Sequence, residues 1–191
     1  MQSVCLLFAG RRGLDDYNLR TSIIRVPEVS QKIKSAQLIF DHKENSIDLY
    51  SYALSSDTDY SDRPQLRVLV SEIVQIGLYE RYIKFRHKPQ FMIGKMNNSA
   101  LKVCSGKMSF QEFVINSDFF QQLNNISNLN ESTRLSGLKL EEYSSVYLKD
   151  NRYEDYNAQS KDCYSIIHEI GNDNIINQYI HIGPCIDFRK Q

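Results

Sequence analysis

Apolar residues recur every three or four positions between residues 64 and 85. The repeat consists of Leu66, Leu69, Ile73, Ile76 and Ile83. This period is that of an amphipathic α-helix. Pro64 suits its first turn, where a backbone N–H has no partner within the helix. The pattern therefore predicts a long helix that begins near Pro64.

Shorter apolar runs alternate with further helical repeats along the chain. Residues 3–9 form a continuous apolar run closed by a glycine, which is typical of a buried strand, whereas apolar positions in 29–40 recur at helical spacing. Further strands are expected at 89–94, 144–148 and 178–184, and a further helix at 161–170. Strands that alternate with helices favour an α/β fold built on a parallel sheet.

Ser109 and Glu112 have the spacing of a capping box, and they predict a helix that continues past Phe120. The asparagine-rich stretch that follows has no period and indicates a loop. We expect one domain over residues 1–191, in which residues 124–160 are an irregular segment.

Composition narrows the classes of function. Hydrophobic residues make up 41% of the 191 residues, and the 23 basic residues balance the 23 acidic ones, so we expect a globular protein without general affinity for nucleic acid or membranes. The apolar run at Val4 has no basic residue before it, which favours a buried strand of a cytoplasmic protein over a signal peptide. The four cysteines form no CxxC pair, so we expect neither a metal site nor a cofactor.

The stretch "PQFMIG" ends at Gly94 and precedes a helix-like segment, which is the layout of a nucleophile elbow. Such an elbow presents a serine, cysteine or threonine two residues after the glycine. Here that residue is Met96, which has no nucleophilic group.

Four stretches lie in the order seen in one enzyme family: "LFAGRRG", "RPQL", "GKMNNSALKVCSGKMSFQEF" and "HIGPC". Over residues 3–10, 60–123 and 161–188 the chain resembles the malonyl-CoA:acyl-carrier-protein acyltransferases of fatty-acid and polyketide synthesis. The resemblance implies a shortened α/β-hydrolase-like acyltransferase core with a mainly parallel sheet.

The departures from the family pattern are concentrated at its catalytic positions. On this resemblance Met96 replaces the nucleophilic serine, Lys95 the histidine before it, and Arg11 the glutamine of the oxyanion turn. Asp118 is the nearest match to the arginine that binds the malonyl carboxylate. The segment between Asp118 and His181 is also too short for the small ferredoxin-like subdomain and the catalytic histidine, so we expect that subdomain to be missing.

The resemblance and its departures predict a catalytically inactive acyltransferase-like protein that binds or scaffolds synthase components. Two alternatives stay open: an active acyltransferase or thioester hydrolase with a rearranged site, and a regulatory or nucleic-acid-binding protein. For the first alternative Ser99 and Cys104 are the candidate nucleophiles, and His168 and His181 the candidate bases. We interpret Cys104 as a core residue and both histidines as structural or surface residues.

A basic stretch, "RYIKFRHK", is the candidate partner site. It contains Arg81, Lys84, Arg86 and Lys88, interleaved with aromatic residues. These cations suit the carboxyl end of a helix, the phosphates of a nucleic acid, or an acidic acyl carrier protein. We favour a carrier protein or a ketosynthase as partner over nucleic acid.

Two other surfaces are candidates for contact with a partner. The tyrosine-rich stretch over 141–158 is either a partner surface or a solvated loop. Core surface left open by the missing subdomain suits a homodimer.

Overall fold

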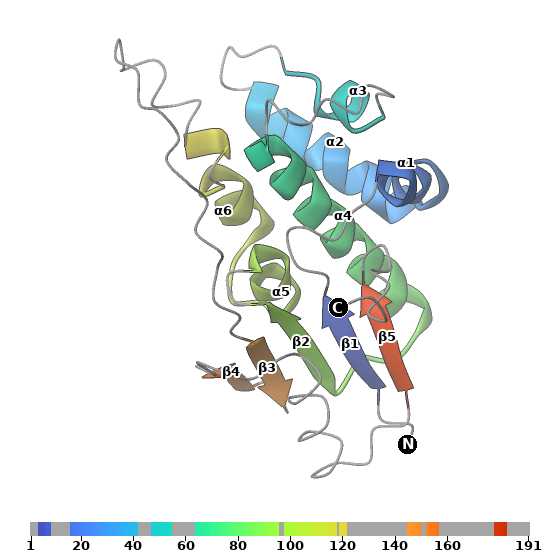
Figure 1. Cartoon of the computed structure of the whole chain (residues 1–191), viewed down its shortest axis with the longest axis vertical. Helices are drawn as coiled ribbons and strands as arrows, with labels where there is room; N and C mark the ends of the chain where they lie inside the picture. The colour runs from blue at the N-terminus through green and yellow to red at the C-terminus, as the bar shows by residue number, and fades with distance from the viewer. Residues whose placement is uncertain are drawn as a thin grey trace.

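The computed structural model combines a five-stranded sheet with helices packed beside it (Figure 1). It describes residues 4–8, 16–41, 47–54, 64–95, 98–117, 119–121, 145–149, 152–156 and 178–182. The strands are β1 (Val4–Phe8), β2 (Phe91–Lys95), β3 (Ser145–Lys149), β4 (Arg152–Tyr156) and β5 (Gln178–Ile182). The helices are α1 (Asp16–Arg25), α2 (Pro27–Asp41), α3 (Leu49–Leu54), α4 (Pro64–Phe85), α5 (Ser99–Cys104) and α6 (Phe110–Ile115).

The sheet is mixed, with the strand order β4-β3-β2-β1-β5. β1 lies between β2 and β5 and is parallel to both, so the carboxyl ends of these three strands share one edge. β3 pairs antiparallel with both β2 and β4. The expected mainly parallel sheet is therefore correct for β2-β1-β5 alone. β3 and β4 are antiparallel because only residues 150 and 151 separate them, and parallel strands need a much longer connection.

The two antiparallel strands lie inside the segment 124–160, which we expected to be irregular. β3 confirms the strand expected at 144–148, and β4 is an additional strand. Their sequences, "SVYLK" and "RYEDY", contain the β-branched and aromatic residues that favour strands. The helix expected at 161–170 lies outside the described residues.

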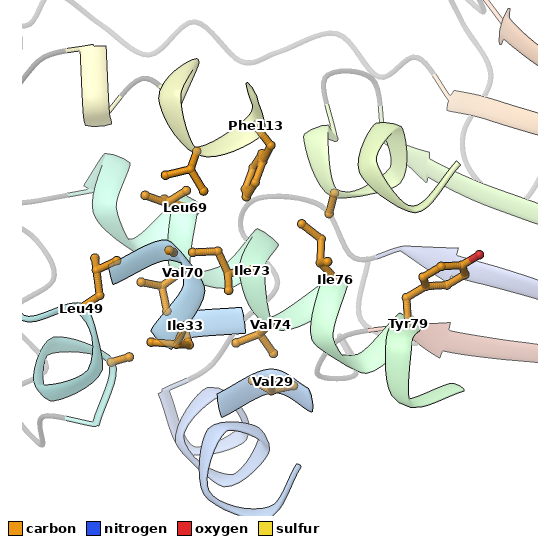
Figure 2. Close-up of a cluster of buried hydrophobic side chains, with 14 of the residues drawn as sticks. Val29, Ile33, Leu49, Leu69, Val70, Ile73, Val74, Ile76, Tyr79 and Phe113 are labelled. Atoms are coloured by element: carbon orange, nitrogen blue, oxygen red, sulfur yellow. The ribbon is translucent and has the colours of Figure 1, made fainter. Parts of the chain in front are cut away.

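The core is built around α4, which confirms the long helix expected from the apolar repeat. α2 packs along α4 so closely that a Cβ added to Gly77 would lie 2.5 Å from the Cα of Val29. Only glycine permits this approach. The apolar side chains of α4 gather with those of α2, α3 and α6 in one cluster (Figure 2). Its labelled members include Val29, Ile33, Leu49, Leu69, Ile73, Val74 and Phe113.

The capping box before α6 is confirmed, but the helix is shorter than expected. The Ser109 hydroxyl accepts the Glu112 N–H at 3.1 Å, and the Glu112 carboxylate accepts the Ser109 N–H at 2.8 Å. α6 ends at Ile115, because the Ser117 hydroxyl donates to the carbonyl of Val114 and accepts the N–H of the buried Phe120. Ser117 thus separates α6 from the next helical turn.

α1 and α3 are helices that the apolar pattern did not predict. Asp48 caps α3, since one oxygen of its carboxylate accepts the N–H groups of Tyr50 and Ser51 at 3.0 and 2.9 Å. α3 has only six residues, which is too short for a hydrophobic repeat to be visible in the sequence.

Candidate functional site

Gly94 lies where the carboxyl end of β2 meets the end of β1 and the start of α5. A Cβ at this position would lie 3.2 Å from the Cδ2 of Leu101, 3.3 Å from the Cβ of Phe8 and 3.6 Å from the Cβ of Asn98. Glycine is therefore required by the close approach of three elements. β2 and α5 confirm the strand and the helix that the sequence predicts on either side of this position, while residues 96 and 97 between them lie outside the described residues.

The start of α5 is capped by side chains of this chain. The Asn98 side-chain oxygen accepts the N–H of Leu101 at 3.0 Å, and its amide nitrogen donates to the Gln75 side chain at 3.2 Å. An oxygen of the Glu72 carboxyl group accepts the N–H of Ser99 at 3.1 Å. In a nucleophile elbow the backbone N–H of the residue after the nucleophile is one of the donors that stabilise an oxyanion. That residue is Asn97 here, which lies outside the described residues, whereas the N–H groups of Ser99 and Leu101, further along the chain, are bound by side chains of this protein.

The side chains of Glu72, Gln75 and Asn98 are buried, as is that of Ser71 on the same helix as Glu72 and Gln75. We call these four residues the buried polar cluster. Sequence reasoning missed this cluster. The only sequence signal is that Ser71, Glu72 and Gln75 share one face of a helix that is otherwise strongly apolar. Polar residues in that pattern are normally predicted to be exposed to solvent. They are buried here because α2 and α5 both pack against α4.

The expected catalytic positions are only partly described. Lys95 is the last residue of β2 and pairs in register with Ser145 of β3. Arg11, Met96 and Asp118 lie outside the described residues, so their roles stay predictions. His181 lies in β5 opposite Leu7 of β1. Since β1 separates β5 from β2, the backbone of His181 is two strand spacings, about 10 Å, from that of β2.

The alternative nucleophiles, Ser99 and Cys104, lie at the two ends of α5, and the surroundings of Cys104 do not favour a thiolate. Burial, followed by the neighbouring Glu80 carboxylate, raises the pKa of the Cys104 thiol well above its usual value, which keeps the thiol protonated. Ser99 is the first residue of α5, and its N–H is held by Glu72. Of the four histidines, the structure describes the side chain of His87 alone, which is exposed beyond the carboxyl end of α4.

The basic stretch begins in the last turns of α4 and continues into the connection to β2. α4 runs from the helical part of the molecule past β1 and β5 (Figure 1), and the chain then enters β2, where the Gln90 N–H donates to the carbonyl of Val4 at 3.1 Å. Val4 and Gln90 lie at the amino ends of β1 and β2. The end of this connection is therefore separated from Gly94 by the length of β2.

Two of the four predicted cations make an ion pair within the chain. Lys84 Nζ lies 3.0 Å and an Arg81 guanidinium nitrogen 3.5 Å from the same oxygen of Glu28, whose side chain is buried. The hydrogen bond from Lys84 is the main cause of the lowered pKa of Glu28, and a backbone hydrogen bond and the charge of Arg81 act in the same direction. Arg86 and Lys88 are exposed.

Neither a metal-binding cluster nor a membrane-spanning helix is found in the described part of the chain. Within the ranges given above, no group of three or more histidine, cysteine, aspartate or glutamate side chains could hold a metal ion. Among the helices described, none is long and apolar enough to cross a membrane.

The fold is similar to part of a known acyltransferase. The solved structure of the malonyl CoA-acyl carrier protein transacylase from Coxiella burnetii matches this chain with a TM-score of 0.51 and 21% sequence identity. The match covers 59% of this chain and 35% of the transacylase, so the chain corresponds to about a third of that protein's length. At this identity the match shows a shared α/β fold. No protein-family model and no curated protein matches the sequence.

Proposed function

We propose that this chain is an acyltransferase-like protein that has lost acyl transfer and acts as a binding or scaffold component of a fatty-acid or polyketide synthase system. The observation that carries the proposal is Met96, which stands two residues after Gly94 at the nucleophile position of the elbow and has no nucleophilic group. The start of α5 supports it, because the Glu72 carboxyl group accepts the Ser99 N–H at 3.1 Å and this donor is therefore not available to a substrate. Displacing Glu72 would leave a buried polar group without that hydrogen bond, which costs about 1–3 kcal/mol.

The residues around this site support the same conclusion. Acyl transfer needs a nucleophile, a base within hydrogen-bond reach and donors for the oxyanion. Met96 stands at the nucleophile position of the elbow, Lys95 precedes it, and Asp118 replaces the arginine expected to bind a malonyl carboxylate. The raised pKa of Cys104 weighs against the alternative of a rearranged active site.

The proposed loss of acyl transfer is tested by incubating the intact protein with malonyl-CoA and measuring the mass of the protein. We expect no added mass, since Met96 at the elbow cannot form an acyl-enzyme and the Cys104 thiol is kept protonated. A catalytically active transacylase treated in parallel serves as the positive control. A stable adduct of malonyl or acetyl mass on any serine or cysteine would overturn the proposal.

We propose an acyl carrier protein as the partner, bound by Arg81, Lys84, Arg86 and Lys88. Acidic partners are attracted to such cations, and each exposed pair contributes only ~0.2–1 kcal/mol. The helical rise places Phe85 about 20 Å along α4 from Glu72, so a partner bound there serves as a scaffold contact rather than a substrate at the elbow. A ketosynthase and a second copy of the chain are the other partners within this proposal.

The partner is tested by titrating carrier proteins from the same organism at two salt concentrations. Reversing Lys84, Arg86 and Lys88 to glutamate should weaken binding by more than about tenfold at low salt. The effect should shrink at high salt, because the Debye length falls below about 10 Å above 0.1 M. Lys107→Glu, an exposed cation in the turn after α5, is the matched control. Equal affinity of the triple variant and the wild type would move the interface elsewhere.

A further inference from the structure

The carboxyl end of α4 presents an exposed aromatic ring in contact with two cations. The side chain of Phe85 is 60% exposed, which is unusual for a phenylalanine in a helix that is otherwise part of the core. The Arg81 guanidinium carbon lies 4.3 Å and the Lys84 ammonium nitrogen 5.6 Å from the centre of the ring. These are distances at which a cation is attracted to an aromatic face.

Glu28 of α2 holds both cations in place. One carboxylate oxygen accepts from Lys84 Nζ at 3.0 Å and contacts Arg81 at 3.5 Å. The side chains of Arg81 and Lys84 are still 47% and 61% exposed, so each keeps N–H donors directed to solvent. Long side chains that are already ordered lose less conformational entropy when a partner binds. The surface is therefore pre-organised, and Glu28 shows that a carboxylate fits between these two cations.

We propose that Phe85 is the apolar anchor of a docking surface for an acidic amphipathic helix of a partner protein. We define this docking surface as Arg81, Lys84 and Phe85. The ring contacts the apolar side chains of the incoming helix, and the two cations bind carboxylates that flank them. Aromatic and arginine side chains together are the usual composition of a binding hot spot. This inference rests on the proposed function and identifies the residue on which its partner contact depends.

The surrounding charges favour an acidic helix over a nucleic acid. Glu28 lies between the two cations of the docking surface, and Glu80, one turn earlier on α4, pairs with Lys32 at 2.7 Å. A phosphate backbone needs a continuous row of cations, and these carboxylates interrupt it. A helix with a few carboxylates around an apolar stripe matches this mixture of basic, acidic and aromatic side chains.

The experiment compares Phe85→Ala with Ile83→Ala in titrations against the carrier protein. Ile83 is an exposed apolar residue of the same helix, 39% exposed, and lies about 200° around the axis from Phe85. We expect Phe85→Ala to lower the affinity by about tenfold or more, as hot-spot residues do, and Ile83→Ala to leave it unchanged. Phe85→Ala should keep the salt dependence of the wild type, because the anchor is apolar, whereas the charge reversals should reduce it.

The outcomes separate the docking surface from the identity of the partner. If the wild type binds the carrier protein and Phe85→Ala binds equally well, the anchor is overturned while the proposed partner stands. If the wild type binds no carrier protein, that partner is wrong, and a synthetic acidic amphipathic peptide replaces it as the probe. Loss of peptide binding in Phe85→Ala then supports the docking surface, and no peptide binding by the wild type overturns it. Binding of single-stranded oligouridine that depends on Phe85 would assign the surface to nucleic acid instead.

Discussion

The carboxyl group of Glu72 joins two elements through a single backbone donor. It is buried on α4, and its oxygen accepts the N–H of Ser99, the first residue of α5. Asn98 and Gln75 extend the contact through the side-chain hydrogen bond between them. A six-residue helix is too short to be stable on its own. The position of α5, and with it the shape of the elbow, therefore depends on this buried polar cluster.

Replacing Glu72 by alanine should destabilise the protein. The change removes the acceptor of the partly buried Ser99 N–H, so the free energy of unfolding should fall by about 1–3 kcal/mol. Urea unfolding followed by circular dichroism measures this difference. Glu72→Gln keeps a side-chain oxygen and is the matched control, with a smaller expected loss. An alanine variant as stable as the wild type would mean that the hydrogen bond contributes nothing.

Contacts such as that of Glu72 with Ser99 lie beyond what the sequence pattern can predict. The apolar repeat identifies α4 because all of its information lies within one segment. The burial of Glu72 depends on which helices pack on either side of α4, and those helices are distant in the sequence. The same limit explains why Gly94 was predicted at the elbow, from a local strand–glycine–helix pattern, while the residues that surround it were not.

At the scale of elements, α2 and α4 are joined by a close backbone contact and by charge. Gly77 permits the approach to Val29, and Glu28 at the start of α2 binds the two cations near the end of α4. The sequence predicts both helices from their apolar spacing, but it gives no sign that two residues of the predicted basic stretch are bound to Glu28. Cations at the end of a helix were expected to face a partner or solvent.

This ion pair makes part of the stability dependent on pH. The pKa of Glu28 is lowered from 4.5 in the folded state, mainly by the hydrogen bond from Lys84. The contribution of the ionised Glu28 to the free energy of unfolding should therefore be fully present above about pH 4.5. It should be lost as the pH falls through the lower folded-state pKa. The difference in unfolding free energy between the wild type and Glu28→Gln should accordingly be largest near neutral pH and vanish in acid.

Denaturant unfolding of both proteins over a series of pH values measures this effect. Lys84→Gln, which removes the main partner, should weaken the same pH dependence. Asp48 and Glu112, whose pKa values are also lowered by local hydrogen bonds, are present in every variant and cancel in the comparison. A difference that is constant with pH would contradict the role assigned to Glu28.

At the scale of the whole molecule, α4 joins the region of Gly94 to the docking surface. Glu72 of α4 binds the first residue of α5, and Phe85 at the end of the same helix lies about 20 Å further along its axis. The edge of the sheet at Gly94 collects the carboxyl ends of β1, β2 and β5, which is where open parallel sheets place their ligand sites. In this chain the contacts described at that edge are internal, whereas the ring of Phe85 and its two cations are exposed.

Placing a serine at position 96 should not by itself produce acyl-transfer activity. In Met96→Ser the residues that the family resemblance places at the neighbouring positions, Lys95 and Asp118, are unchanged, and Glu72 still binds the Ser99 N–H. We therefore expect no transfer of malonyl groups from malonyl-CoA to a carrier protein above the rate of the wild type. Measurable transfer by this single variant would mean that the remaining catalytic groups are present.

The place of β1 in the sheet also governs the order in which the chain can fold. β1 can pair with β2 once the first half of the chain is made, since Cys5 lies opposite Phe91. Its other neighbour is β5, where Val4 lies opposite Gln178. During synthesis one edge of the apolar strand "VCLLF" therefore stays open until residues 178–182 emerge. Open apolar edges invite pairing with other chains, so a nascent or shortened chain without β5 is the form most exposed to aggregation.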